Sequence, residues 1–287
     1  MKAMGHCRWK LQLRYENVIL ADPRYCAERN VEQALWKSAF YHGIETFRRA
    51  MEECPDYREE AKMHLLALVD EGTIFYENLL DKFQETYGFS LSPFLEAEGA
   101  PRPPGLPDSV RLVLISAQKI YICLGDLARY REHALGTTNY GRARYYYLKA
   151  QQLAPKNGRP YNQLAILAIY ARRKLDAVYY YMRSLAASNP FLTARESLLA
   201  LFDEARKKYE HAEKKRQEEK AKQQAPKQTT GTSSHRSSRD LSDDGRGDEL
   251  GELDKLSTVE LNKRFVLSFL HVHGKLFTKV GMETFSE

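Results

Sequence analysis

A 34-residue internal repeat constrains the fold of this chain more than any other feature of its sequence. Two sets of small and aromatic residues are related by this period: Ala143, Tyr147 and Ala150 in the first copy, and Ala177, Tyr181 and Ser184 in the second. Such a period is typical of tetratricopeptide-like helical hairpins. Small side chains let two helices touch, and a large aromatic side chain fills the space between them. The repeat therefore predicts antiparallel helical hairpins in this part of the chain.

The sequence before the repeat also shows helical periodicity and no strand pattern. Apolar residues recur at helical spacing in residues 31–54, 57–87 and 108–131. Asn30, followed by Gln33 three residues later, is expected to cap the first of these helices. Prolines and glycines interrupt the helical pattern across residues 90–107 and predict a loop. We therefore expect an all-α fold built from long antiparallel helices.

Changes in composition divide the chain into three segments. Residues 1–216, which end in an expected helix, are predicted to form one domain. Residues 217–256 are rich in polar and charged residues and lack aromatic side chains, so they cannot bury enough apolar surface to offset the entropy of ordering. We predict a disordered linker there. Ser257 and Glu260 have capping-box spacing before an apolar helix. Residues 257–287 are therefore expected to begin a truncated helical domain.

The sequence offers little that points to an enzyme, a metalloprotein or a membrane protein. It contains no nucleophile elbow, P-loop or metalloprotease motif, so we expect no catalytic residue and no enzymatic activity. Its four cysteines lack zinc-binding spacing, and we expect no metal and no cofactor. No apolar run is long enough to predict a membrane span. The formal charge of +6 permits acidic partners without identifying one.

Residues 133–175 form a basic region that contains no aspartate or glutamate. Nine of the eighteen tyrosines lie between Tyr140 and Tyr181, where they overlap this region. Basic and aromatic side chains together can bind single-stranded nucleic acid by charge and stacking. Direct binding of RNA or another single-stranded nucleic acid is therefore one hypothesis for function. The alternative is that the basic residues form a solvated face and that the tyrosines pack within the repeats.

A second hypothesis is recognition of a phosphate group. Arg48 and Arg49 lie late on an early helix, Arg129 and Tyr130 lie near the end of a later helix, and Asn162 lies on a helix of the repeat. Guanidinium and phenol groups that converge from different helices would form a charge-assisted cage for a phosphomonoester. We expect Arg129 to lie in an open pocket, outside the core.

Several longer runs of sequence carry a resemblance to a known family. The most specific is the run PKNGRPYNQLA at residues 155–165, and LWKSAF at 35–40, DEGTIFY at 70–76 and LGDLARYR at 124–131 support it. Over roughly residues 8–215 the chain resembles the ever-shorter-telomeres/Smg family of nonsense-mediated mRNA decay factors, most closely its Smg-six branch. The nuclease residues of that branch have no match in this chain.

The resemblance implies a 14-3-3-like fold of antiparallel helices with tetratricopeptide-like hairpins. It implies an adaptor that binds phosphopeptides and recognises the phosphorylated RNA helicase of nonsense-mediated decay. Telomerase components are a further implied partner, together with a role in telomere maintenance. The implied locations are the cytoplasm and the nucleus. A scaffold that binds its partners without phosphate is a third hypothesis.

The phosphate pocket of 14-3-3 proteins transfers to this chain in part. The run Gly125-Asp126-x-x-Arg129-Tyr130 matches the pocket motif, which implies that Arg129 and Tyr130 bind the phosphate. Arg48 or Arg49 matches the pocket arginine of the early helix, and Asn162 matches the asparagine that holds the peptide backbone. Tyr41 replaces the pocket lysine. Three other basic residues are candidates to supply the missing charge: Arg159, Arg172 and Arg173.

Overall fold

The computed structural model describes residues 2–95, 105–224 and 256–279. The chain divides into two compact units, Met1–Ala194 and Arg195–Glu287. The described residues contain helices and no β-strand, apart from one isolated parallel bridge between Asn157 and Asn189. The expected all-α class is confirmed.

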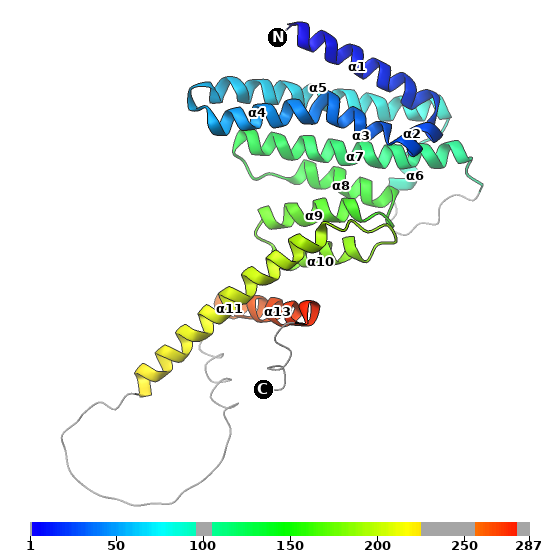
Figure 1. Cartoon of the computed structure of the whole chain (residues 1–287). Helices are drawn as coiled ribbons and strands as arrows, with labels where there is room; N and C mark the ends of the chain where they lie inside the picture. The colour runs from blue at the N-terminus through cyan, green and yellow to red at the C-terminus, as the bar shows by residue number, and fades with distance from the viewer. Residues whose placement is uncertain (1, 96–104, 225–255, 280–287) are drawn as a thin grey trace, which may run out of the picture. The chain divides into compact units, whose positions relative to one another are not determined.

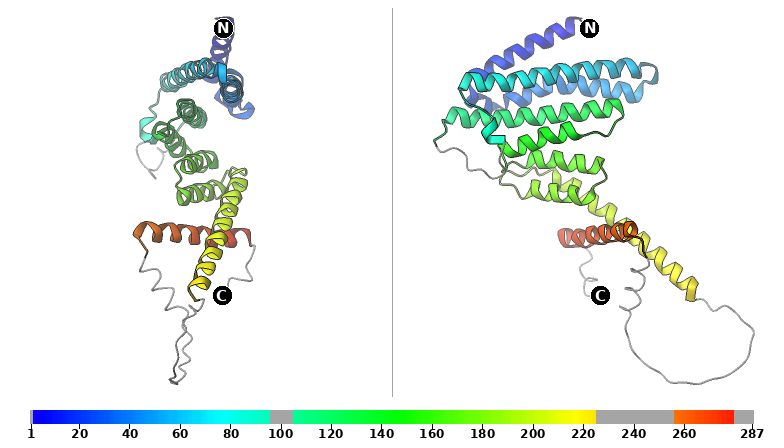
Figure 2. Two further views of the ribbon diagram at one scale, coloured as in Figure 1. Left: turned by 90° about the vertical axis from the view of Figure 1, so that its left-hand side faces the viewer. Right: turned by 180° about the vertical axis from the view of Figure 1, so that it is seen from behind.

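The first unit is a stack of helices that follow one another along the chain (Figures 1 and 2). Its elements are α1 (Lys2–Ala21), α2 (Pro23–Arg29), α3 (Val31–Leu35), the π-helical turn η1 (Trp36–Tyr41), α4 (His42–Glu53), the 3-10 turn η2 (Pro55–Tyr57), α5 (Arg58–Tyr87), α6 (Ser92–Leu95), α7 (Asp108–Leu135), α8 (Gly141–Leu153), α9 (Gly158–Tyr170) and α10 (Lys174–Leu185). Each long helix packs on the next, α4 on α5, α5 on α7, α7 on α8 and α9 on α10.

The two hairpins expected from the repeat are α7–α8 and α9–α10. All six repeat residues are buried: Ala143, Tyr147, Ala150, Ala177, Tyr181 and Ser184. Tyr147 of α8 packs directly on Gly125 of α7, where a Cβ atom would overlap the tyrosine ring. A small residue at the crossing and an aromatic side chain against it are the packing that the repeat predicts.

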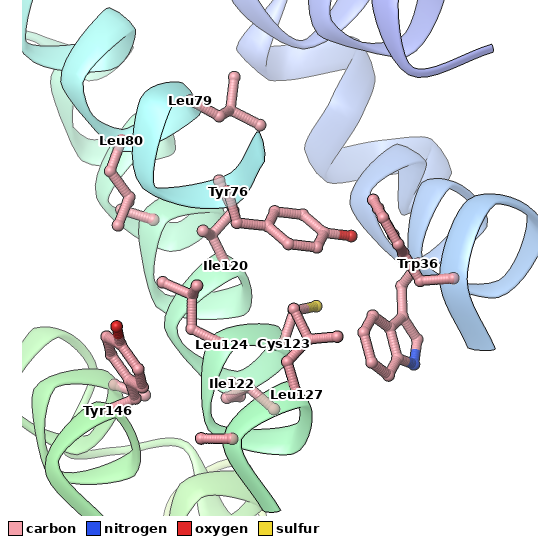
Figure 3. Close-up of a cluster of buried hydrophobic side chains, with 14 of the residues drawn as sticks. Trp36, Tyr76, Leu79, Leu80, Ile120, Ile122, Cys123, Leu124, Leu127 and Tyr146 are labelled. Carbon is pink, nitrogen blue, oxygen red and sulfur yellow. The ribbon is translucent and has the colours of Figure 1, made fainter. Parts of the chain in front are cut away.

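The core of the first unit lies between α5, α7 and the α3–η1 segment. Figure 3 shows Tyr76 of α5 and Cys123 of α7 directed toward Trp36, with Leu124 and Leu127 beside them. Burial raises the pKa of the Cys123 thiol to about 12, so that it is an uncharged member of this apolar cluster. This shared core fixes α4, which continues η1, relative to α7.

Asn30 lies at the N-cap position of α3, as expected, but the capping box expected there is wrong. Asn30 adopts a left-handed backbone conformation with φ of 51° and ends α2, and its side chain makes no capping hydrogen bond to α3. Asparagine tolerates this conformation better than most residues. A sharp corner between α2 and α3 therefore replaces the expected capping box.

The second unit contains α11 (Ala194–Gln224) and α13 (Thr258–Thr278). The two helices contact each other through stacked rings of Tyr209 and His271, whose centroids lie 4.2 Å apart. The expected capping box of Ser257 and Glu260 is confirmed.

The helix predicted to end at residue 216 runs to Gln224, so the boundary expected there falls inside α11. Its C-terminal half is built from good helix formers joined by ion pairs three or four residues apart, such as Lys215 with Glu219. The rest of the predicted linker, residues 225–255, and residues 280–287 lie outside the described residues. Over the described ranges, no helix is both long and apolar enough to cross a membrane.

Candidate functional site

A cavity of about 540 Å³ opens between α4 and α7 of the first unit. Figure 1 shows these two helices as neighbouring rows of the stack. The residues that line the cavity are Glu45, Arg48, Met51, Glu52, Arg58, Leu65, Arg129, Tyr130, His133, Ala134 and Tyr170. The structure therefore brings together three of the four residues predicted to bind a phosphopeptide.

Arg129 is held rigidly at the base of this cavity. Its Nη2 donates to Asp126 Oδ1 at 3.1 Å, and its Nε donates to Tyr147 Oη at 3.4 Å. Burial alone would lower the pKa of Arg129, but the Tyr147 phenol and the Asp126 carboxylate outweigh it, so the pKa is raised. The side chain lines the cavity and lies outside the apolar core, as expected, but at 15% exposure it is less open to solvent than expected. The cause is its long-range contact with α8.

Tyr130 and Arg48 meet at one carboxylate. Tyr130 Oη donates to Glu45 Oε1 at 3.2 Å, and Arg48 Nη2 forms an ion pair with Glu45 Oε2 at 2.9 Å. The hydrogen bond from Arg48 is the main cause that lowers the pKa of Glu45. Burial raises the pKa of Tyr130 to about 12, so its hydroxyl keeps its proton and remains a donor at neutral pH. Two candidate phosphate ligands thus share an internal anion.

The structure settles which early arginine faces the cavity. Arg48 lines the cavity, whereas the neighbouring Arg49 is exposed and is not among the lining residues. Arg48 also pairs with Glu52 at 2.7 Å. Tyr41, which replaces the family's pocket lysine, lies at the end of η1 and is not among the residues that line the cavity.

The additional cation in the cavity is Arg58, at the start of α5. The expectation that Arg159, Arg172 or Arg173 supplies the missing charge is wrong, because none of the three lines this cavity. Arg58 was not singled out in the sequence because it lies just after a proline turn, and only the antiparallel packing of α4 on α5 returns it to the pocket.

The pKa of His133 is sensitive to the positive charges of the cavity. His133 follows Arg129 by one helical turn, and its ring meets the Tyr170 ring edge-on with centroids 5.2 Å apart. Partial burial, followed by the charges of Arg129 and Arg48, lowers its pKa. The two arginines therefore act on one imidazole. The spacing of Arg129 and His133 on one helix face was visible in the sequence, whereas the contact with Tyr170 of α9 was not.

Asn162 is not brought to this cavity. It is buried on α9 with 7% exposure and is not among the residues that line the cavity. Its neighbour Gln163 instead donates to Asp126 Oδ1 at 2.8 Å. Asp126 accepts from Arg129, Tyr147 and Gln163, so it joins α7, α8 and α9 behind the site. The role predicted for Asn162 stays a prediction.

The basic region at 133–175 is partly neutralised by residues that pack against it. Arg142 pairs with Glu77 of α5 at 3.3 Å, and Arg173 pairs with Asp176. Tyr146, Tyr147 and Tyr161 are buried within the repeats. Tyr145 and Tyr179 are each 55% exposed and are available for stacking.

Metal binding gains no support from the described ranges. These contain no group of three or more histidine, cysteine, aspartate or glutamate side chains arranged to hold an ion. The four cysteines are free; Cys7 and Cys54 are exposed, and Cys26 and Cys123 are buried.

Two family models match almost the whole chain. The one described as "Telomerase activating protein Est1" matches residues 30–135, and the "Est1 DNA/RNA binding domain" matches residues 143–287. The chain belongs to the Est1 family. The resemblance inferred from the sequence runs is thereby confirmed.

Curated relatives of this Est1-family chain carry names from telomere biology and mRNA decay. "Telomerase-binding protein EST1A" of Danio rerio is 47% identical over 99% of this chain and 20% of the relative. "Nonsense-mediated mRNA decay factor SMG7" of Arabidopsis thaliana is 31% identical over 96% of this chain and 28% of the relative. The chain thus spans between a fifth and a third of these relatives' lengths.

A solved structure is also similar to this Est1-family chain. "Structure of the C. elegans SMG5-SMG7 complex" matches with a TM-score of 0.47 and 18% sequence identity. The match covers 69% of this chain and 48% of the solved chain.

Proposed function

We propose that this chain is a phosphopeptide-binding adaptor module of nonsense-mediated mRNA decay, which recognises a phosphorylated segment of the decay RNA helicase. The observation that carries the proposal is the joint lining of one cavity by Arg48, Arg129 and Tyr130. The names of the relatives, which include nonsense-mediated mRNA decay factors, support a role in this process. The chain acts by binding, without catalysis, in the cytoplasm and the nucleus.

A phosphate group would enter the cavity by replacing Glu45 as the partner of Arg48 and Tyr130. Arg129 is already ordered by Asp126 and Tyr147, so little side-chain entropy is lost when it binds an oxygen of the ligand. Arg58 adds a third positive charge at the mouth. Charge-assisted hydrogen bonds of this kind contribute about 1.5–3 kcal/mol each. Asn162 does not line the cavity, and its predicted role, holding the peptide backbone, is kept as part of the proposal.

The test is a titration of the chain with one peptide in phosphorylated and unphosphorylated form. We expect the phosphorylated peptide to bind at least tenfold more tightly. Arg48→Met should remove most of that difference. Arg49→Met, one position along the same helix and outside the cavity, is the matched control and should bind as the parent does. Equal binding of both peptides by the parent would instead support the scaffold without phosphate dependence.

A second candidate function is the binding of RNA or single-stranded telomeric DNA, with a role in telomere maintenance and telomerase components as partners. It is favoured by the description of the family model over residues 143–287 and by the exposed rings of Tyr145 and Tyr179. An RNA oligomer and a telomeric oligonucleotide, titrated at two salt concentrations, test it. Binding that weakens steeply with salt and is lost in Tyr145→Ala would support this function. A matched Tyr57→Ala variant, exposed on η2, is the control.

A further inference from the structure

A second cavity, of about 490 Å³, lies in the first unit and shares no residue with the Arg48–Arg129 cavity. Its volume falls within the roughly 300–1,000 Å³ typical of ligand sites. We call it the amide cavity because five of its thirteen lining residues carry side-chain amides. The lining residues are Asn30, Glu32, Gln33, Lys37, Gln118, Lys119, Ile122, Cys123, Asn157, Arg159, Asn189, Pro190 and Phe191.

Gln118 of α7 is the unusual residue of this cavity. Its side chain is 1% exposed, and its Nε2 has no hydrogen-bond partner among the described residues. Its Oε1 accepts from Asn157 Nδ2 at 3.1 Å. A buried amide donor without a partner is disfavoured and is rare in folded proteins.

Rotating the Gln118 amide by 180° does not remove the problem. Asn157 caps α9, and its Oδ1 accepts from the backbone N–H of Arg159 at 3.0 Å. This cap fixes Asn157 Nδ2 as a donor. Gln118 must therefore present its oxygen to Asn157, and its NH₂ group is left to find an acceptor elsewhere. The network of capping bonds thus leaves an unused donor on Gln118, a residue of the cavity lining, and that donor is itself buried in the free protein.

The charges around the amide cavity favour a ligand with carboxylates. Glu32 is buried with 2% exposure, and its carboxylate is already bonded to Lys119 at 2.9 Å and to Ser116. Arg159 donates to the neutral Gln33 at 3.0 Å, and Lys37 is exposed at the cavity. Two cations therefore face the cavity beyond the Glu32–Lys119 pair. The fixed charge of Glu32 disfavours a compact dianion such as phosphate more than it disfavours a peptide whose charges are spread out.

From these observations, we propose that the amide cavity binds an unphosphorylated acidic peptide segment of a partner protein. A backbone carbonyl of the peptide accepts from Gln118 Nε2 once the surrounding side chains shift to expose this buried atom, and acidic side chains pair with Arg159 and Lys37. The amides of Asn30, Gln33 and Asn189 offer both donors and acceptors, which is what an extended peptide backbone requires. The proposal is independent of phosphate recognition in the Arg48–Arg129 cavity.

The test uses the full chain and a blocked six-residue peptide of alternating aspartate and glutamate. The resonances of the Gln118 side-chain amide should shift and saturate as this peptide is added. Inorganic phosphate at the same concentration should produce no comparable shift. An equal response to phosphate overturns the assignment to a peptide. A contact between the Gln118 amide and a long-lived water, unchanged by the peptide, overturns the site altogether.

Variants separate this site from the other cavity. Gln118→Met removes the unused donor, so we expect an unchanged or raised melting temperature and at least a tenfold loss of peptide affinity. Lys37→Glu, at the surface, should weaken binding of the peptide without affecting folding. If Gln118→Met is unstable, the affinity of Lys37→Glu for the peptide tests the proposal instead. Arg48→Met should bind the acidic peptide as the parent does. Parent-like binding by Lys37→Glu, or a loss in Arg48→Met, would overturn the proposal.

Discussion

Tyr130 Oη lies 3.2 Å from Glu45 Oε1 and donates a hydrogen bond that joins α7 to α4. The same carboxylate holds Arg48 at 2.9 Å. In the free protein, Glu45 therefore occupies the donors that a phosphate would use. The cavity carries its own competing anion, so the proposed affinity for phosphate is the difference between two charge-assisted arrangements rather than the sum of new contacts.

Glu45→Gln should strengthen phosphopeptide binding. Glutamine keeps an acceptor for Tyr130 but removes the negative charge that competes for Arg48. Charge pairs that are partly exposed contribute up to about 1 kcal/mol, which corresponds to roughly a fivefold gain in affinity. Calorimetric titration of parent and variant with the phosphorylated peptide measures this gain in affinity. Weaker binding by Glu45→Gln would mean that Glu45 positions Arg48 for the ligand instead of competing with it.

The pKa of His133 should rise when a phosphopeptide binds. In the free protein its pKa is lowered by partial burial and by the charges of Arg129 and Arg48. A bound dianion would offset those charges and favour the imidazolium form. Nuclear magnetic resonance titration of the His133 ring, with and without saturating peptide, gives both values. An unchanged pKa would place the phosphate away from these arginines.

His133 also makes stability depend on pH in the free protein. Because its pKa is lower in the folded state than the ordinary 6.5, the unfolded chain takes up the proton first as the pH falls. The stability associated with neutral His133 is thus present above pH 6.5 and is lost below it, down through the folded-state pKa. His133→Gln should unfold in urea with a shallower loss of stability between pH 7 and pH 5. Identical pH profiles for parent and variant would contradict this assignment.

The sequence predicted local and repeated features well, and long-range polar contacts poorly. The hairpins followed from Ala143, Tyr147 and their copies, because small residues and aromatics at fixed spacing report on helix crossings. The burial of Arg129 depends on Gln163 and Tyr147 reaching Asp126 from other helices, a convergence that no local spacing encodes. The Gln118 donor was equally invisible, since its isolation arises from the cap that Asn157 forms on α9.

Ala177→Leu should destabilise the first unit. Ala177 is fully buried at the crossing of the second hairpin, and overpacking a tight contact costs roughly 1–3 kcal/mol. Ala186→Leu, just after α10 and exposed, is the matched control and should change stability little. Urea denaturation followed by circular dichroism compares the two. A parent-like midpoint for Ala177→Leu would show that the hairpin contact is loosely packed.

Gly125→Ala should weaken both folding and phosphopeptide binding. A Cβ atom at this position would overlap the ring of Tyr147, and the ring cannot retreat freely because its hydroxyl donates to Asp126 at 2.7 Å. Overpacking of about 1–3 kcal/mol outweighs the gain of up to about 1 kcal/mol from replacing glycine in a helix. Displacing Tyr147 also moves an acceptor of Arg129, so affinity for the phosphopeptide should fall roughly tenfold, equivalent to about 1.4 kcal/mol. Gly5→Ala on α1, where a Cβ atom meets nothing within 4 Å, should leave binding unchanged. If Gly125→Ala lost stability but kept full affinity, Arg129 would not depend on Tyr147 for its place in the cavity.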